Sequence, residues 1–115
     1  MNSTILEHIN ELFNSYDLFA GKYKEKIRSS ITKKFPDLSK KEIKEVEDYL
    51  GLLFEYYVKY ADLLADKYKT PFLPKGEEAQ KEILEYVSEC QKQYPEIDME
   101  HILDIFSTVC WLANR

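Results

Sequence analysis

Four side chains in this sequence are of the types that bind transition metals in proteins: His8, His101, Cys90 and Cys110. No two of them have the short spacing that builds a zinc or iron site. The Glu-x-x-His pair found in di-iron helical bundles is also absent from the sequence. His101 directly follows Glu100 in the predicted first turn of a helix, a position typical of the protein surface. We therefore expect no metal site.

No catalytic or cofactor motif accompanies these residues. A nucleophilic Ser or Cys needs an adjacent base, and a chain with two histidines and no turn motif around any serine offers none. The three glycines are scattered, so the sequence lacks a phosphate-binding loop. Among 21 Asp and Glu residues, pairs suited to acid–base chemistry arise by chance. We expect a protein that is not an enzyme and holds no cofactor.

Both cysteines are expected to be free, buried thiols. They lie in two predicted helices that turn near Pro95. An antiparallel arrangement would separate Cys90 from Cys110 by about eight residues along the axis, roughly 12 Å. A disulfide requires Cα atoms within about 7 Å of one another.

The start of the chain, MNSTILEHINEL, lacks the basic residues and the unbroken apolar run of a secretory signal. No stretch approaches the roughly 18 consecutive apolar residues of a membrane-spanning helix. With free thiols, these features predict a cytoplasmic protein without membrane contact.

The elements that must position any site are helices. Three Gly and four Pro leave few turns, and 44% hydrophobic with 32% charged residues is a globular composition. The apolar spacing predicts an all-α fold, a bundle of about five helices in a single domain over residues 1–115. The expected helices cover residues 4–20, 22–34, 40–69, 77–93 and 99–113, and the first two are either separate or continuous through Gly21.

The long helix over residues 40–69 is the expected centre of this bundle. Ser39 and Glu42 form a capping box, Leu38 and Ile43 a hydrophobic staple, and Pro71 ends the helix. A mid-helix glycine, Gly51, suggests a close crossing by another helix. Apolar residues recur in steps of three and four at Ile43, Val46, Leu50, Leu53, Tyr57, Tyr60 and Leu64.

Two shorter helices have predicted starts of the same kind. Thr4 and Glu7 form a second capping box, and Asp98 caps the last helix, with Ile97 and Ile102 as its staple. The expected inward face of that helix is Met99, Ile102, Leu103, Phe106, Val109, Cys110 and Ala113.

Positive charge is concentrated in residues 22–44, where nine Lys and Arg face three acids. This segment superficially resembles a helix-turn-helix. Its turn contains Pro36, however, and its second helix is too apolar to read base edges. We therefore expect no nucleic-acid binding, and keep a nucleic-acid-associated regulator using residues 22–44 as an alternative.

Negative charge is concentrated in residues 77–104, where nine acids face Lys81 and Lys92. Four glutamates fall within a stripe of about 60° on one predicted helix. Like charges four residues apart destabilise a helix slightly. The stripe is either a solvated face or a docking surface for a basic partner. It consists of Glu78, Glu82, Glu85 and Glu89.

Nine tyrosines in 115 residues are the other unusual feature. Tyrosine is enriched at protein interfaces, because it joins an apolar ring to a polar tip. Tyr49, Tyr56 and Leu63 repeat every seven residues along one flank of the long helix. They form either a core contact or an exposed recognition stripe.

Together these features predict a non-enzymatic protein-binding module. Its most concrete form is a small acidic inhibitor, an immunity or antitoxin-like protein that binds a basic surface of a partner protein such as a toxin. In its acidic, tyrosine-rich and helical character the chain is similar to small helical bacterial immunity proteins. A homo-oligomeric helical scaffold is a further alternative. The predicted binding residues are Glu78, Glu82, Glu85, Glu89, Tyr49 and Tyr56.

Overall fold

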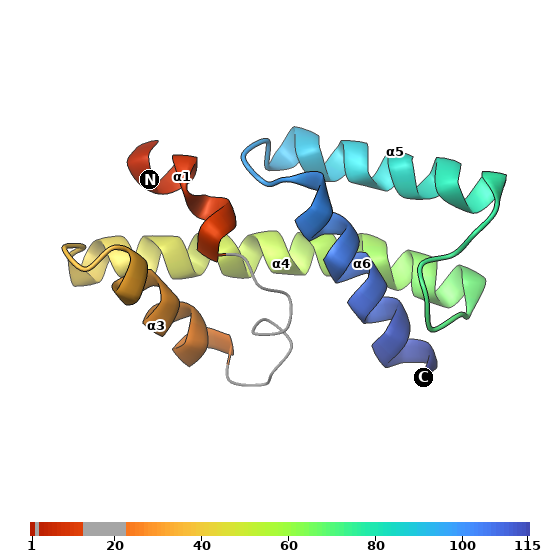
Figure 1. The fold of residues 1–115 in the computed structure, drawn as a ribbon, viewed down its shortest axis with the longest axis horizontal. Helices are drawn as coiled ribbons and strands as arrows, with labels where there is room; N and C mark the ends of the chain where they lie inside the picture. The colour runs from red at the N-terminus through yellow and green to blue at the C-terminus, as the bar shows by residue number, and fades with distance from the viewer. Residues whose placement is uncertain (2, 13–22) are drawn as a thin grey trace. The chain divides into compact units, whose positions relative to one another are not determined.

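The computed structural model describes Met1, residues 3–12 and residues 23–115, and all regular elements in these ranges are helices (Figure 1). The order is α1 (Ser3–Glu7), the 3-10 helix η1 (Ile9–Leu12), α3 (Tyr23–Lys34), α4 (Lys40–Tyr68), α5 (Glu77–Gln93) and α6 (Met99–Asn114). The predicted all-α class with one long helix is confirmed. None of these helices has the length and apolar character needed to cross a membrane.

The chain divides into two compact units, Met1–Phe54 and Glu55–Arg115. The division falls inside α4, so this helix contributes side chains to the core of each unit. The interpretation of residues 1–115 as a single domain stays a prediction.

The start of α4 has the predicted capping box. The Glu42 N–H donates to Ser39 Oγ at 3.2 Å, and the Ser39 N–H donates to Glu42 Oε1 at 3.1 Å. Two free amides of the first turn are thereby satisfied. At the other end, Lys69 adopts a left-handed conformation with φ 49° and its N–H bonds to the Ala65 carbonyl. This geometry ends α4 at Tyr68, three residues before Pro71.

The predicted apolar seam of α4 is largely confirmed. Ile43 and Tyr60 are only half-buried. The fully buried members are Val46, Leu50, Leu53, Tyr57 and Leu64.

The described residues do not show the close helix crossing that was expected at Gly51. Within the described residues, nothing outside the helix's own backbone lies within 4 Å of the position that a Cβ would occupy. The predicted close crossing at this glycine is therefore wrong for the helices that the structure describes.

The first unit joins α1, η1 and α3 to the N-terminal part of α4. In α3, Ile27 and Ile31 are buried one turn apart, as the spacing predicts. Arg28 of α3 donates two hydrogen bonds to Glu47 of α4, one of them 3.1 Å from Nη2 to Oε2. The remaining core side chains are Ile5, Ile9, Leu12, Val46, Leu50 and Leu53.

The predicted helix over residues 4–20 differs from the structure. α1 begins at Ser3, one residue before the predicted cap Thr4, and it ends at Glu7. The His8 N–H then bonds to the Ile5 carbonyl, three residues back, at 3.1 Å. This tighter winding places the buried residues Ile9 and Leu12 on the same side of η1. The remainder of that helix and its possible continuity through Gly21 lie outside the described residues.

The second unit joins α5 and α6 to the C-terminal part of α4. The bounds of α5 agree with the sequence prediction, and its buried face is Ala79, Ile83, Val87 and Cys90. Ile97 and Ile102 are both buried at the start of α6, as a staple requires.

The buried face of α6 differs from the prediction at four positions, one of which is Leu103, predicted inward but only half-buried. Met99 and Ala113 are exposed, although the spacing placed them inward, and Ile105 is fully buried although it was not expected to be. Met99 and Ala113 occupy the first and last turns, where fewer neighbours cover the helix. The buried residues of α6 are Ile102, Ile105, Phe106, Val109 and Cys110.

Candidate functional site

Three of the four glutamates predicted as a stripe face solvent on α5. The side chain of Glu78 is 83% exposed and that of Glu89 is 50% exposed, and Glu85 is also exposed. Glu77 and Glu78 occupy the first turn, where the helix dipole favours carboxylates. We call Glu78, Glu85 and Glu89 the acidic face.

Glu82 belongs instead to a polar cluster that joins α4 and α5. Its side chain is only 19% exposed. Tyr68 Oη donates to Glu82 Oε2 at 2.6 Å, and Tyr86 Oη donates to Oε1 at 3.0 Å. Lys67 Nζ donates to Oε2 at 3.0 Å. We call Lys67, Tyr68, Glu82 and Tyr86 the Glu82 cluster.

Charge and hydrogen bonding in this cluster reinforce one another. The Tyr68 hydroxyl and the Lys67 ammonium hold the pKa of the Glu82 carboxyl below its ordinary value. The same bonds raise the pKa of Tyr68 and of Lys67. Glu82 thus stays ionised, and its hydrogen bonds link the end of α4 to α5.

The acidic face is only partly neutralised by its own chain. Lys67 Nζ lies 3.4 Å from Glu78 Oε1, and Lys92 Nζ lies 3.3 Å from Glu89 Oε1. For Glu85 there is no ion pair within the part of the chain that the structure describes. The contribution of Lys67 was missed from the sequence, because it comes from α4 and not from the neighbouring turns of α5.

Tyr56 lies in an aromatic cluster of the second unit. Its ring makes edge contacts with Tyr60 at 5.4 Å and with Tyr94 at 5.7 Å between centroids. A hydrogen bond with Tyr60 and burial raise the pKa of the Tyr56 hydroxyl. The other members are Tyr57, which contacts Tyr94, and Tyr86, which contacts Tyr60. These contacts favour the core alternative for Tyr56.

Tyr49, the other tyrosine predicted to bind a partner, lies in the first unit. Its side chain is half-buried on α4. Tyr49 and Tyr56 therefore belong to different compact units.

Part of the basic segment is paired with acids of its own unit. Lys34 Nζ lies 2.6 Å from Glu11 Oε2 and lowers the pKa of that carboxyl. Arg28 is held by Glu47, and Lys44 Nζ lies 3.4 Å from Asp48. Of the lysines around the corner between α3 and α4, Lys33, Lys40 and Lys41 are exposed without such a pair in the described ranges.

The two cysteines are free and buried, as expected. Burial and the nearby Glu89 charge raise the pKa of the Cys90 thiol to about 12. Burial also raises the pKa of Cys110. A raised pKa keeps both thiols protonated at neutral pH, whereas a nucleophilic cysteine reacts as the thiolate.

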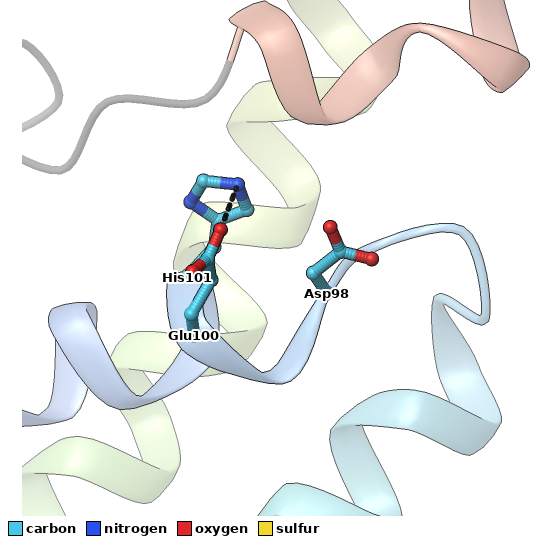
Figure 2. Close-up of side chains that lie close together, drawn as sticks. All are labelled: Asp98, Glu100 and His101. Carbon is cyan, nitrogen blue, oxygen red and sulfur yellow. Dashed lines mark ion pairs between the residues drawn. The ribbon is translucent and has the colours of Figure 1, made fainter.

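One group of potential metal ligands lies at the start of α6. One ligand atom from each of Asp98, Glu100 and His101 lies within 4.8 Å of the others. Figure 2 shows the Glu100 carboxylate beside the His101 ring, 3.8 Å from Oε1 to Nε2, with Asp98 on the loop that precedes α6. Asp98 and Glu100 are exposed, and acids are favoured at helix starts in any case. This grouping alone does not define a metal site.

Comparisons with models of known protein families, with curated proteins and with solved structures find no match for this chain. The acidic face of α5 is exposed at all three of its glutamates, and Glu85 forms no ion pair with the residues that the structure describes.

Proposed function

We propose that this protein is a non-enzymatic binding module, a small acidic inhibitor of the immunity or antitoxin type, which acts in the cytoplasm on a basic surface of a partner protein. The observation that carries the proposal is the acidic face of α5. Glu78, Glu85 and Glu89 project from one side of a single helix, and Glu85 forms no ion pair with the described residues.

The charge distribution between the units supports the same proposal. Residues 1–54 contain equal numbers of acidic and basic residues, nine of each. Residues 55–115 contain twelve acids against seven Lys and Arg, so they carry the whole net charge of −5. A partner that brings Lys or Arg side chains to α5 would form charge-assisted hydrogen bonds. Opposite potentials would also accelerate association at low salt.

Catalysis is not part of the proposal. The one carboxylate with a shifted pKa on α5, Glu82, is shifted downward and already accepts three hydrogen bonds. A general acid needs a raised pKa, and a general base needs a free lone pair aimed at the substrate. Both cysteines have thiols that resist ionisation.

The nucleic-acid alternative has weaker support. Arg28, Lys34 and Lys44 are engaged by carboxylates, which leaves fewer charges for phosphates. Titration with duplex DNA at several salt concentrations separates the two proposals. Phosphate binding by several lysines would make the affinity fall steeply with salt.

The test begins with co-purification of the tagged protein from its native host, followed by identification of the partner. Binding is then measured with the triple variant Glu78→Lys, Glu85→Lys and Glu89→Lys, in which Glu82 is retained because of its structural contacts. We expect association at low salt to slow by about tenfold or more.

A matched control makes the same change of charge on exposed acids of α4, in the triple variant Glu45→Lys, Glu55→Lys and Asp62→Lys. Both variants should keep the helical circular dichroism of the parent. If the two variants weaken binding equally, or if neither weakens it, the acidic face of α5 is not the binding surface.

A further inference from the structure

The loop between α4 and α5 presents an exposed aromatic ring. This loop, residues 69–76, reads KTPFLPKG. Phe72 is 66% exposed, more than any other large hydrophobic residue in the described ranges. Packing within the second unit therefore does not account for an aromatic residue at this position.

Contacts on both sides of Phe72 restrain the loop. Proline fixes φ at Pro71 and at Pro74, and Pro74 is buried. The Phe72 N–H donates to Thr70 Oγ1 at 3.4 Å. The Asn114 side chain donates to the Thr70 carbonyl at 3.4 Å. A ring held in this way loses little conformational entropy when it binds a partner.

A hollow of about 350 Å³ lies beside the ring. It is lined by Tyr68, Thr70, Phe72, Leu73, Pro74 and Lys75. This volume is near the lower limit of ligand pockets, and it suits a protruding side chain better than a whole cofactor.

The charge at the hollow is opposite to that of the rest of the unit. No carboxylate lines it, and the exposed Lys75 stands at its edge with no ion pair among the described contacts. If a partner placed an apolar side chain against Phe72, the residues next to that side chain in the partner's sequence would lie near the Lys75 ammonium and not near a carboxylate.

We infer that this loop is a docking site for a partner protein segment in which an aliphatic side chain is flanked by Asp or Glu. The aliphatic side chain fills the hollow against Phe72, and an adjacent carboxylate pairs with the Lys75 ammonium. The inference does not rest on the function proposed above, because the two surfaces select partners of opposite charge.

The test uses the ¹⁵N-labelled full chain and three capped tripeptides, Asp-Leu-Asp, Lys-Leu-Lys and Asp-Ala-Asp. Asp-Leu-Asp should give saturable chemical-shift changes at the backbone amides of the non-proline residues in the loop 69–76. The other two peptides should bind at least about fivefold more weakly. Phe72→Ala should abolish saturation while the melting temperature stays close to that of the parent, because the ring is exposed.

Lys75→Glu should reverse the preference, so that Lys-Leu-Lys becomes the tighter ligand. Because the variant should still bind one of the peptides, this result would distinguish a site with altered charge preference from a misfolded protein. Leu84→Ala is the matched control, because Leu84 is 60% exposed on α5 and lies outside the hollow. That variant should bind Asp-Leu-Asp like the parent.

Three results would overturn the inference. They are the absence of saturable shifts with Asp-Leu-Asp, equal binding of the acidic and basic peptides, and Phe72-dependent self-association in sedimentation. The last result would mean that a second copy of this chain covers the loop.

Discussion

The Tyr68 hydroxyl donates a 2.6 Å hydrogen bond to the Glu82 carboxylate, which joins the last residue of α4 to the middle of α5. Lys67 and Tyr86 bond to the same carboxylate. Glu82, which the sequence placed on a solvated stripe, therefore makes tertiary contacts within the second unit. Its substitution should lower the stability of the protein.

Glu82→Gln should lower the free energy of unfolding by about 1 kcal/mol, because two charge-assisted hydrogen bonds become neutral ones and the ion pair with Lys67 is lost. Urea denaturation measures the change. Glu85→Gln, on the exposed acidic face, is the control and should stay within about 0.5 kcal/mol of the parent. Equal effects of the two variants would show that the Glu82 cluster contributes no stability.

The contribution of Glu82 should also depend on pH. Its carboxyl has a lowered pKa in the folded protein, so its stabilisation is fully present above the unfolded value of 4.5. It is lost as the pH falls through the folded pKa. Parent and Glu82→Gln should therefore differ in urea stability at neutral pH and converge progressively below about pH 4.5. A difference that stays constant down to pH 2 would contradict this linkage.

Local signals in the sequence predict much of α3 and of α4. Ser39 and Glu42 mark a helix start through contacts three residues apart, and such contacts need no tertiary context. The same holds for the four-residue repeat of Ile27 and Ile31 in α3.

The role of Glu82 was not predictable in this way. Its partners Lys67 and Tyr68 precede it by more than a dozen residues and reach it only when α4 and α5 pack together. Helical periodicity correctly grouped the four glutamates on one side of α5, but it carries no information on what another helix brings to that side. The sequence does show a Lys-Tyr pair at the end of α4, but no fixed spacing connects such a pair to the carboxylate that it contacts.

Ser39→Ala should destabilise the protein by about 1 kcal/mol, because the Glu42 amide loses its acceptor at the start of α4. Ser88→Ala is a suitable control, since Ser88 is exposed in the middle of α5, where alanine favours the helix. Urea denaturation compares the two variants. An unchanged midpoint for Ser39→Ala would mean that the capping box is not populated in solution.

Gly51→Ala should stabilise the protein by up to about 1 kcal/mol. Alanine is the better helix former, and no described neighbour outside the helix's own backbone lies within 4 Å of the added Cβ. A raised melting temperature confirms an open position at Gly51. A lowered one would show that another segment of the chain, or a second copy, packs closely against α4 at this glycine.

Asn114→Ala should loosen the end of α6 from the loop that carries Phe72. The Asn114 side chain donates to the carbonyl groups of Ala65 and Thr70, at 3.1 and 3.4 Å, so its removal leaves the end of α4 without this cap. We expect a loss of about 1 kcal/mol in the free energy of unfolding and faster amide hydrogen exchange at Phe72. Arg115→Ala removes the neighbouring side chain, which lies over the exposed Trp111 ring, and should leave exchange at Phe72 unchanged. If Asn114→Ala alters stability but not that exchange rate, the loop is held by its prolines alone. The docking site at Phe72 would then depend on Pro71 and Pro74 and not on α6.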